Sequence, residues 1–154
     1  MERIKGFTLV EILIVVVLLG ILAAIVIPTV SQGAVEAKRS ALISDVQLLR
    51  RFILVYKAQH LEVPPGVPNN HDSPEQAFFE QATMASNAEG QTATPGTGGY
   101  DRGPYLSKVP CNPFNGLNKI EFVEEFSSGD DSHGWQYKVA TGQIRADTAG
   151  YEDY

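Results

Sequence analysis

Residues 5–20, KGFTLVEILIVVVLLG, decide the fold, because they place one acidic residue, Glu11, inside an otherwise aliphatic run. The run extends over residues 7–30, which is long enough to cross a bilayer, since a spanning helix needs about 20 apolar residues. A charge at the centre of a membrane helix costs roughly 2.5–3.5 kcal/mol on insertion scales. The chain must therefore pair, neutralise or otherwise use the carboxylate of Glu11.

The residues before this run, MERIKG, carry two positive charges and one negative charge. By the positive-inside tendency they should remain in the cytoplasm, while the C-terminal part of the chain crosses the membrane. A secretory signal peptide would have a shorter apolar core and a small-x-small cleavage site after it, and Gly33-Ala34-Val35 is a poor substitute for that site. An ordinary signal anchor fits the length better but does not explain Glu11.

Composition excludes several classes of function. The net charge of the 154 residues is −6, and no basic cluster exceeds the pairs Lys38-Arg39 and Arg50-Arg51, so nucleic-acid binding is not expected. The single cysteine, Cys111, cannot form an intrachain disulfide. A catalytic thiol needs an activating base, and the three histidines stand in unrelated contexts. We therefore expect no catalytic residue, no cofactor and no enzymatic activity.

The segment Gly6-Phe7-Thr8-Leu9-Val10-Glu11 resembles the processing motif of type IV pilins and type II secretion pseudopilins. In that family a basic leader ends in Gly and precedes an apolar segment that begins with Phe and has Glu as its fifth residue. The resemblance implies that a membrane prepilin peptidase cuts between Gly6 and Phe7. It also implies N-methylation of the new amino group of Phe7.

Cleavage would explain Glu11, because it creates a positively charged amine at Phe7 that can pair with a carboxylate. Within one chain this pairing is strained, since the amine begins the same helical turn, whereas Glu11 of one subunit can reach the amine of a neighbour. The resemblance implies that this pairing sets the register of subunits during filament assembly. The alternative is an incidental glutamate that reaches the headgroups. Pro28 lacks an N–H and predicts a bend or a locally opened stretch in the helix.

The expected fold class is α+β and pilin-like, with one long helix over residues 7–61 packed on a small antiparallel sheet. The second half of this helix carries an apolar stripe with helical spacing: Leu42, Val46, Leu49, Ile53 and Tyr56, with Leu48, Phe52 and Val55 alongside. Val63-Pro64-Pro65-Gly66 ends the helix.

The predicted organisation is a leader at 1–6, a transmembrane and filament-core helix at 7–30, and a globular head at 31–154. Within the head we expect a helix at 31–61, a loop with a short helix at 62–103, a β-meander at 104–146 and a tail at 147–154. Ser73, Pro74 and Gln76 predict the start of the short helix, with Gln76 completing a capping box. Residues 87–103 are expected to form a surface loop, and the strands are predicted at 119–126, 135–139 and 143–146.

Residues 103–146 resemble the C-terminal half of the major, secretion-system pseudopilins, in the order GPYLSKVPCNPFNG, W-x-Y and TGQIRA. That resemblance implies a calcium ion in a loop near the C-terminus. The candidate ligands are Asp130 and Asp131, or Asp147, Glu152 and Asp153. Calcium takes six to eight oxygens in a closed loop, and neither cluster has a matching spacing, so a solvated acidic turn is favoured and no metal ligand is assigned.

The predicted function is that of a structural subunit that polymerises through its N-terminal helix into a type II secretion pseudopilus. The expected partners are further copies of the chain, minor pseudopilins, the prepilin peptidase and N-methyltransferase, and an inner-membrane assembly platform. The expected location is the inner membrane, with a cytoplasmic N-terminus and a periplasmic head, followed by a periplasmic filament. The alternatives are a type IV pilin of a surface pilus and, in another class, a membrane-anchored enzyme.

Overall fold

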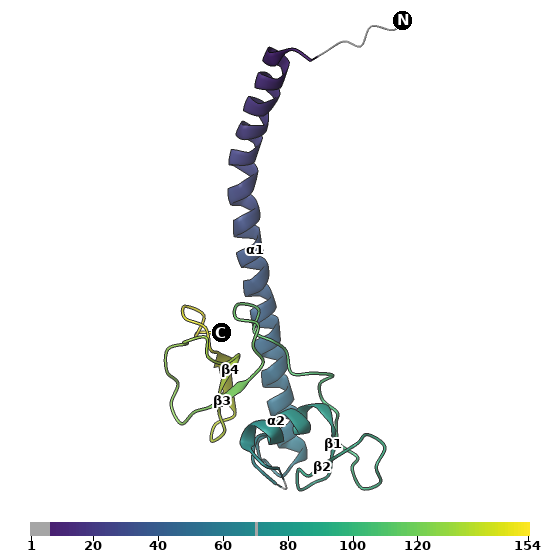
Figure 1. Ribbon diagram of the computed structural model, residues 1–154. Coiled ribbons are helices and arrows are strands. Elements are labelled where there is room, and N and C mark those ends of the chain that lie inside the picture. The colour runs from purple at the N-terminus through teal and green to yellow at the C-terminus, as the bar shows by residue number, and fades with distance from the viewer. Residues whose placement is uncertain (1–6, 70) are drawn as a thin grey trace, which may run out of the picture. The chain divides into compact units, whose positions relative to one another are not determined.

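The computed structural model describes residues 7–69 and 71–154, except for the side chains of residues 25–32. The chain divides into two units, Met1–Lys38 and Arg39–Tyr154. In chain order, its elements are α1 (Leu9–Gln59), α2 (Pro74–Thr83), β1 (Ala85–Ser86), β2 (Thr92–Ala93), β3 (Ile120–Phe122), β4 (Trp135–Lys138) and β5 (Gln143–Ala146). Figure 1 shows β3 and β4 beside the second half of α1, and α2 with β1 and β2 near the end of this helix. The α+β fold class predicted from the sequence is confirmed.

The apolar stripe on the second half of α1 forms one side of the core of the head. All five predicted members are buried, at 0–3% exposure, and so is Phe52. The ring of Phe52 meets the ring of Phe78 edge-on at 5.4 Å, and Phe78 meets Tyr137 of β4 at 5.2 Å. Aromatic rings favour this edge-to-face arrangement because of their quadrupoles. The rings thus connect α1, α2 and the sheet in one apolar cluster.

The helix α1 ends at Gln59, two residues before the predicted end. Leu61 and Glu62 have φ angles of +54° and +64°, which are incompatible with a right-handed helix. The backbone N–H of Glu62 donates to the carbonyl oxygen of Lys57 at 3.0 Å and closes the last turn. Thus the chain leaves the helix before Val63-Pro64-Pro65.

The strands β3, β4 and β5 form a mixed sheet, and the predicted antiparallel meander is wrong at one pairing. Strands β4 and β5 are antiparallel, as predicted, with Trp135 opposite Ala146 and Lys138 opposite Gln143. Strand β3 instead pairs with β4 in the parallel direction, with Ile120 opposite Trp135. Parallel neighbours need a connection that returns the chain to the starting end of the sheet, and residues 123–134 provide it.

The predicted strand at 119–126 is shorter in the structure and ends at Phe122. Beyond it the backbone N–H of Val123 still donates to the carbonyl of Tyr137 at 3.0 Å, and Glu125 pairs with Lys138 at 2.9 Å. Phe126 lies under the guanidinium group of Arg145, 4.4 Å from its ring centre. One backbone hydrogen bond and these side-chain contacts hold residues 123–126 against the sheet without extending the strand.

Helix α2 begins as the sequence predicts, with one difference in its cap. The hydroxyl oxygen of Ser73 accepts a hydrogen bond from the backbone N–H of Gln76, and Pro74 is the first helical residue. The side chain of Gln76 does not return to Ser73 as a capping box requires, because it donates to Glu80 at 2.9 Å. The cap is therefore formed on one side only.

The predicted loop at 87–103 contains a short strand that the sequence analysis missed. Ala85–Ser86 and Thr92–Ala93 pair as an antiparallel hairpin, which begins directly after the end of α2 at Thr83 and Met84. Ser86 also forms a bridge with Arg102, through hydrogen bonds in both directions. Two-residue strands have no periodic pattern, so only these hydrogen bonds define them.

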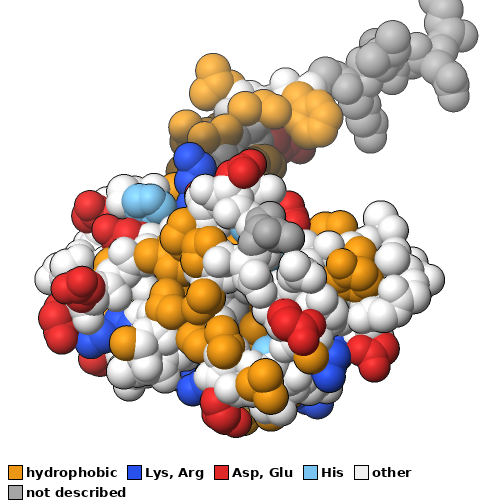
Figure 2. All heavy atoms as spheres, turned by 90° about the horizontal axis from the view of Figure 1, so that it is seen from below, with side chains coloured by type: hydrophobic (Ala, Val, Ile, Leu, Met, Phe, Trp, Pro, Cys, Tyr) orange, Lys and Arg blue, Asp and Glu red, His pale blue; other side chains and the backbone are white. Residues whose placement is uncertain are grey.

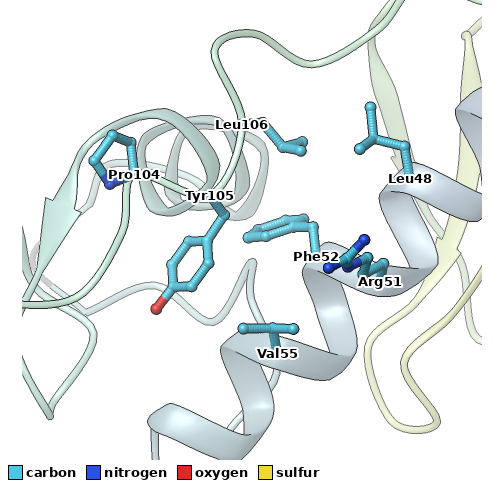
Figure 3. Close-up of a pocket in the computed structure, with 7 residues that line it drawn as sticks. All are labelled: Leu48, Arg51, Phe52, Val55, Pro104, Tyr105 and Leu106. Carbon is cyan, nitrogen blue, oxygen red and sulfur yellow. The ribbon is translucent and has the colours of Figure 1, made fainter.

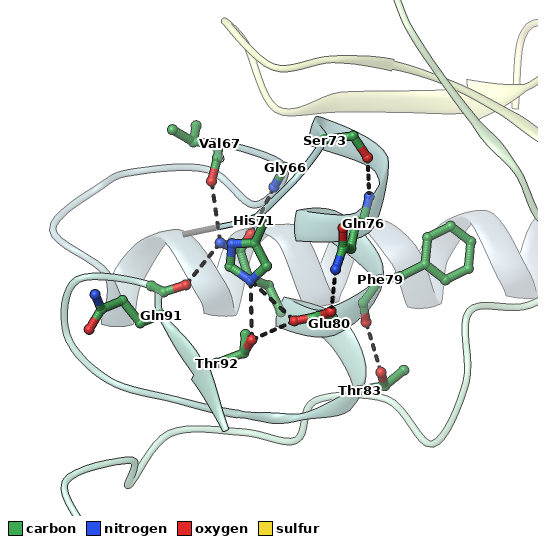
Figure 4. A network of polar contacts seen from close by, with 12 residues as sticks. Gly66, Val67, His71, Ser73, Gln76, Phe79, Glu80, Thr83, Gln91 and Thr92 are labelled. Carbon is green, nitrogen blue, oxygen red and sulfur yellow. Dashed lines mark hydrogen bonds and ion pairs between the residues drawn. The ribbon is translucent and has the colours of Figure 1, made fainter. Parts of the chain in front are cut away.

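A network of polar side chains attaches this hairpin and the chain after α1 to α2 (Figure 4). Buried Gln81 accepts from the backbone N–H of Gly66 at 2.8 Å and donates to the carbonyl oxygen of Gly90 at 3.0 Å. Glu80 accepts from the hydroxyl of Thr92 at 2.7 Å and lies 3.4 Å from Nε2 of His71. Hydrogen bonds from Gln76 and Thr92 lower the pKa of Glu80. The network has a structural role, since it pairs the polar side chains of Glu80, Gln81 and Thr92, whereas Nδ1 of His71 is buried without a hydrogen-bond partner among the described residues.

Candidate functional site

The start of α1 places the carboxylate of Glu11 against Thr8. Gly6, the residue before the predicted cleavage site, lies outside the described residues, whereas Phe7 is described and its side chain is 80% exposed. The backbone N–H and the hydroxyl of Thr8 both donate to Oε2 of Glu11, each at 2.8 Å. The backbone N–H of Glu11 donates in return to Oγ1 of Thr8 at 3.3 Å.

This arrangement is a capping box, T-x-x-E, in which the first and fourth residues satisfy each other's backbone groups. It explains why α1 begins at Leu9 rather than at Phe7. The sequence predicts that Glu11 pairs with the amine of a neighbouring subunit, whereas its partner in the single chain is Thr8, and the three-residue spacing of Thr8 and Glu11 is the signal for this pair. In the single chain the carboxylate thus has local donors before any neighbour arrives.

Beyond the cap, the first part of α1 exposes aliphatic side chains on all sides. The large hydrophobic residues from Leu9 to Leu22 are 48–82% exposed. A helix that is apolar all round buries its surface in a larger assembly or in a membrane. Searched over the described residues, the helices include none that meets both the length and the apolarity of a membrane span. The predicted bend at Pro28 falls within residues 25–32, whose side chains lie outside the described part of the chain.

The acidic residues considered as calcium ligands meet in part around Asp147, which is fully buried. Oδ1 of Asp147 accepts from the backbone N–H of Asp130 at 3.1 Å and from the side chain of Gln136 at 3.2 Å. Oδ2 accepts from the backbone N–H of His133 at 2.8 Å. Hydrogen bonds from the side chain and the backbone of Ser132 lower the pKa of Asp130. Both oxygens of Asp147 are therefore used by donors of the chain itself.

Other members of the predicted clusters take separate positions. Asp131 accepts from the hydroxyl of Thr148 at 2.9 Å, and Glu152 accepts from the backbone N–H of Gly129 at 3.4 Å. Within the described residues, one group of possible metal ligands is close enough together, namely Glu121, His133 and Asp147, whose ligand atoms lie within 4.8 Å of one another. A cation there would compete with the N–H donors of Asp147, so we assign the group a structural role.

The described residues show no arrangement for thiol catalysis around Cys111, which is exposed. His60 contacts Tyr56 and Ser86, His71 contacts Thr92 and Glu80, and His133 contacts Ser132. Each imidazole is thus engaged in a local contact elsewhere. The region with features of a functional site is therefore the start of α1, with Phe7, Thr8 and Glu11.

Comparison with known proteins agrees with this location. A family described as "Prokaryotic N-terminal methylation motif" matches residues 1–27. The chain is 31% identical to the type II secretion system core protein G of Klebsiella pneumoniae over 114 residues, which cover 74% of this chain and 71% of that protein. It is 28% identical to the protein of the same name from Aeromonas hydrophila, over 89% of this chain and 96% of that one.

The corresponding protein of Escherichia coli K12 is 26% identical over 73% of this chain and 68% of its own length. No solved structure matches the chain significantly. The similarity to the core G proteins extends beyond the N-terminal motif into the head. The chain therefore belongs to the family of the type II secretion system core protein G, the major pseudopilins.

Proposed function

We propose that this chain is a structural subunit that polymerises through its N-terminal helix into a type II secretion pseudopilus, which helps to export proteins. The observation that carries the proposal is the combination of an N-terminal methylation motif at residues 1–27 with similarity to core G proteins over most of the chain. The exposed aliphatic surface at the start of α1 supports it, because a surface of this kind is stable only when other apolar groups cover it.

The subunit would be made as a precursor in the inner membrane, with residues 7–30 as the membrane and filament-core segment and the head in the periplasm. A prepilin peptidase would cut between Gly6 and Phe7, and the new amine of Phe7 would be methylated. Glu11 would exchange its bonds to Thr8 for the amine of a neighbouring subunit. Further copies, minor pseudopilins and an inner-membrane platform would be its partners, and no catalytic role is proposed.

Mass spectrometry of the mature protein tests the processing. The chain should begin at Phe7 and carry one added methyl group, and the Gly6→Val variant should accumulate as precursor, because a side chain at the cleavage site hinders entry to the peptidase. Gly33→Val is the matched control, since a Cβ at Gly33 meets nothing within 4 Å. A mature N-terminus elsewhere would contradict the proposed maturation.

Deletion of the gene tests the role in secretion. Folded exoproteins should be retained in the cell envelope, while twitching and surface adhesion persist, and the wild-type gene should restore secretion. Loss of motility with normal secretion would identify a surface pilus instead.

A further inference from the structure

The end of α1 presents a strained and strongly exposed apolar turn, residues 61–63. Leu61 and Glu62 both lie in the left-handed region, with φ of +54° and +64°, which non-glycine residues rarely adopt. Leu61 is 82% exposed and Val63 is 44% exposed. A left-handed residue followed by a backbone hydrogen bond back to the last turn is a common helix ending, and here it leaves the side chain of Leu61 in solvent. We refer to residues 61–63 as the knob.

The surrounding structure holds the knob in place. The backbone N–H of Glu62 donates to Lys57 at 3.0 Å, and that of Val63 donates to the carbonyl of His60 at 2.9 Å. The ring of His60 is buried and stacks on Tyr56, with ring centres 3.8 Å apart. Figure 2 views the head from the end at which α1 stops, and hydrophobic side chains lie together near the middle of that face. The backbone of the knob is thus held in one conformation, which reduces the entropy lost on docking.

A cavity lies beside α1, and Figure 3 shows the residues that line it. The cavity has a volume of about 410 Å³. Leu48, Phe52 and Val55 of α1 line one side of it, and the segment Pro104-Tyr105-Leu106 lines the other. Leu48 and Val55 are 43% and 36% exposed, so the walls are apolar and open to solvent. We refer to this cavity as the groove.

The groove and the knob also carry opposite charges. Arg51 lines the groove and, among the described residues, forms no hydrogen bond or ion pair. In the knob, the carboxylate of Glu62 likewise contacts no donor within the part of the chain that the structure describes. Opposite charges placed at an apolar contact set its register and exclude wrong partners.

We propose that the knob of one copy docks in the groove of a second copy, with Leu61 and Val63 against the apolar walls and Glu62 paired with Arg51. This inference rests on the proposed function as a filament subunit. One rigid chain cannot fill its own groove, because its knob lies about ten residues further along, or about 15 Å at 1.5 Å per residue. Parallel copies would therefore be staggered by about this distance. Because knob and groove are different surfaces, the contact is heterologous and continues from copy to copy as an open filament.

Cysteine crosslinking of the full chain in sheared filaments tests the contact, in a Cys111→Ser background. The double variant Leu61→Cys/Leu48→Cys, treated with a short bis-maleimide, should give a ladder of dimers, trimers and higher oligomers. Each single variant should give no crosslinked oligomer, because in the proposed contact a knob meets a groove and never another knob, and a groove never meets another groove. Dimers from Leu61→Cys alone, or a crosslink to a different envelope protein, would overturn the proposal.

Charge reversal tests the pairing. Arg51→Glu and Glu62→Lys should each lower the filament yield by about tenfold, because like charges then meet in the contact. The combination Arg51→Glu/Glu62→Lys should restore it. Glu124→Lys is the control, since Glu124 is exposed and belongs to neither surface.

The outcomes separate this inference from the proposed function. If the wild-type chain forms filaments but the single charge reversals leave their yield unchanged, the knob and groove are not an interface and the subunit role stands. If the wild-type chain is processed and forms no filament, the proposed function and this contact both fail.

Discussion

Asp147 is the residue at which the loops of the C-terminal region converge. It accepts hydrogen bonds from the backbone of Asp130 and His133 and from the side chain of Gln136, and it is fully buried. A buried carboxylate is stable when donors surround it, because they replace the water that it loses. Among the acidic residues considered as calcium ligands, Asp147 is therefore the one that we expect to stabilise the fold.

Asp147→Asn should destabilise the head by about 1–3 kcal/mol, because the amide group would face a backbone donor that is then left without an acceptor. A urea titration of the full-length protein in detergent micelles would measure this through the fluorescence of buried Trp135, the single tryptophan. Asp153→Asn, at an exposed position, is the control and should change little. Equal midpoints for the two variants would contradict the structural role of Asp147.

His60 should make stability depend on pH. Burial lowers the pKa of His60 below its ordinary value of 6.5, so the unfolded chain binds a proton at a pH at which the folded chain does not. The free energy of unfolding should be greatest above pH 6.5 and should decrease as the pH falls from there toward the folded pKa. Urea titrations over this range should show a weaker pH dependence for His60→Gln than for the His133→Gln control. Equal pH dependence in both variants would exclude His60 as the source.

At the scale of elements, the second half of α1 has two different faces. Leu42, Val46 and Leu49 are fully buried against the head, whereas Leu48 and Val55 remain partly exposed beside the groove. The helical repeat places residues three or four apart on one face, so neighbouring positions have different surroundings. Stability and assembly can therefore be separated by substitutions only a few residues apart.

Phe52→Ala should cost roughly 3–5 kcal/mol, because it removes a buried ring that contacts Tyr56, Phe78 and Tyr105. Leu48→Ala, at a position that is 43% exposed, should cost much less and should instead reduce filament yield. Urea titration and the yield of sheared filaments measure the two effects. A large loss of stability from Leu48→Ala would mean that this residue belongs to the core.

At the scale of the whole molecule, the chain combines an apolar helix start with a polar head. The two units, Met1–Lys38 and Arg39–Tyr154, share α1 as a continuous element. The large hydrophobic side chains of residues 9–22 are exposed in the single chain. The net charge of the whole chain is −6. This division fits the proposed function, in which other apolar groups cover the exposed start of α1.

Glu11→Val should still enter the membrane and be cut after Gly6, because it removes a charge that is costly in lipid. It should fail to form filaments, since the amine of a neighbouring Phe7 would have no carboxylate to pair with. Mass spectrometry of the N-terminus and the yield of sheared filaments provide the measurements, with Thr8→Ser as the control that keeps the capping hydroxyl. Normal filament yield from Glu11→Val would remove Glu11 from the assembly mechanism.

The sequence by itself determined the family and the main helix. The motif at residues 6–11 is read along a continuous stretch of chain, so no tertiary contact is needed to recognise it. The apolar stripe of α1 and the cap at Ser73 depend on neighbours three or four residues away, and both are found in the structure. The roles of Gly6, Phe7, Glu11 and Pro28 in maturation and assembly remain predictions.

Only the tertiary structure decided the features that depend on distant parts of the chain. The parallel pairing of β3 with β4 and the hydrogen bonds of buried Asp147 join distant residues whose local sequence allows other partners. The left-handed turn of the knob was not predicted either, because no glycine marks Leu61 or Glu62, although the hydrogen bonds that close the turn are local to the end of α1. The helices follow from local sequence patterns. The pairing of β3 with β4 and the loops around Asp147 depend on tertiary packing, because their hydrogen bonds link residues far apart in the chain.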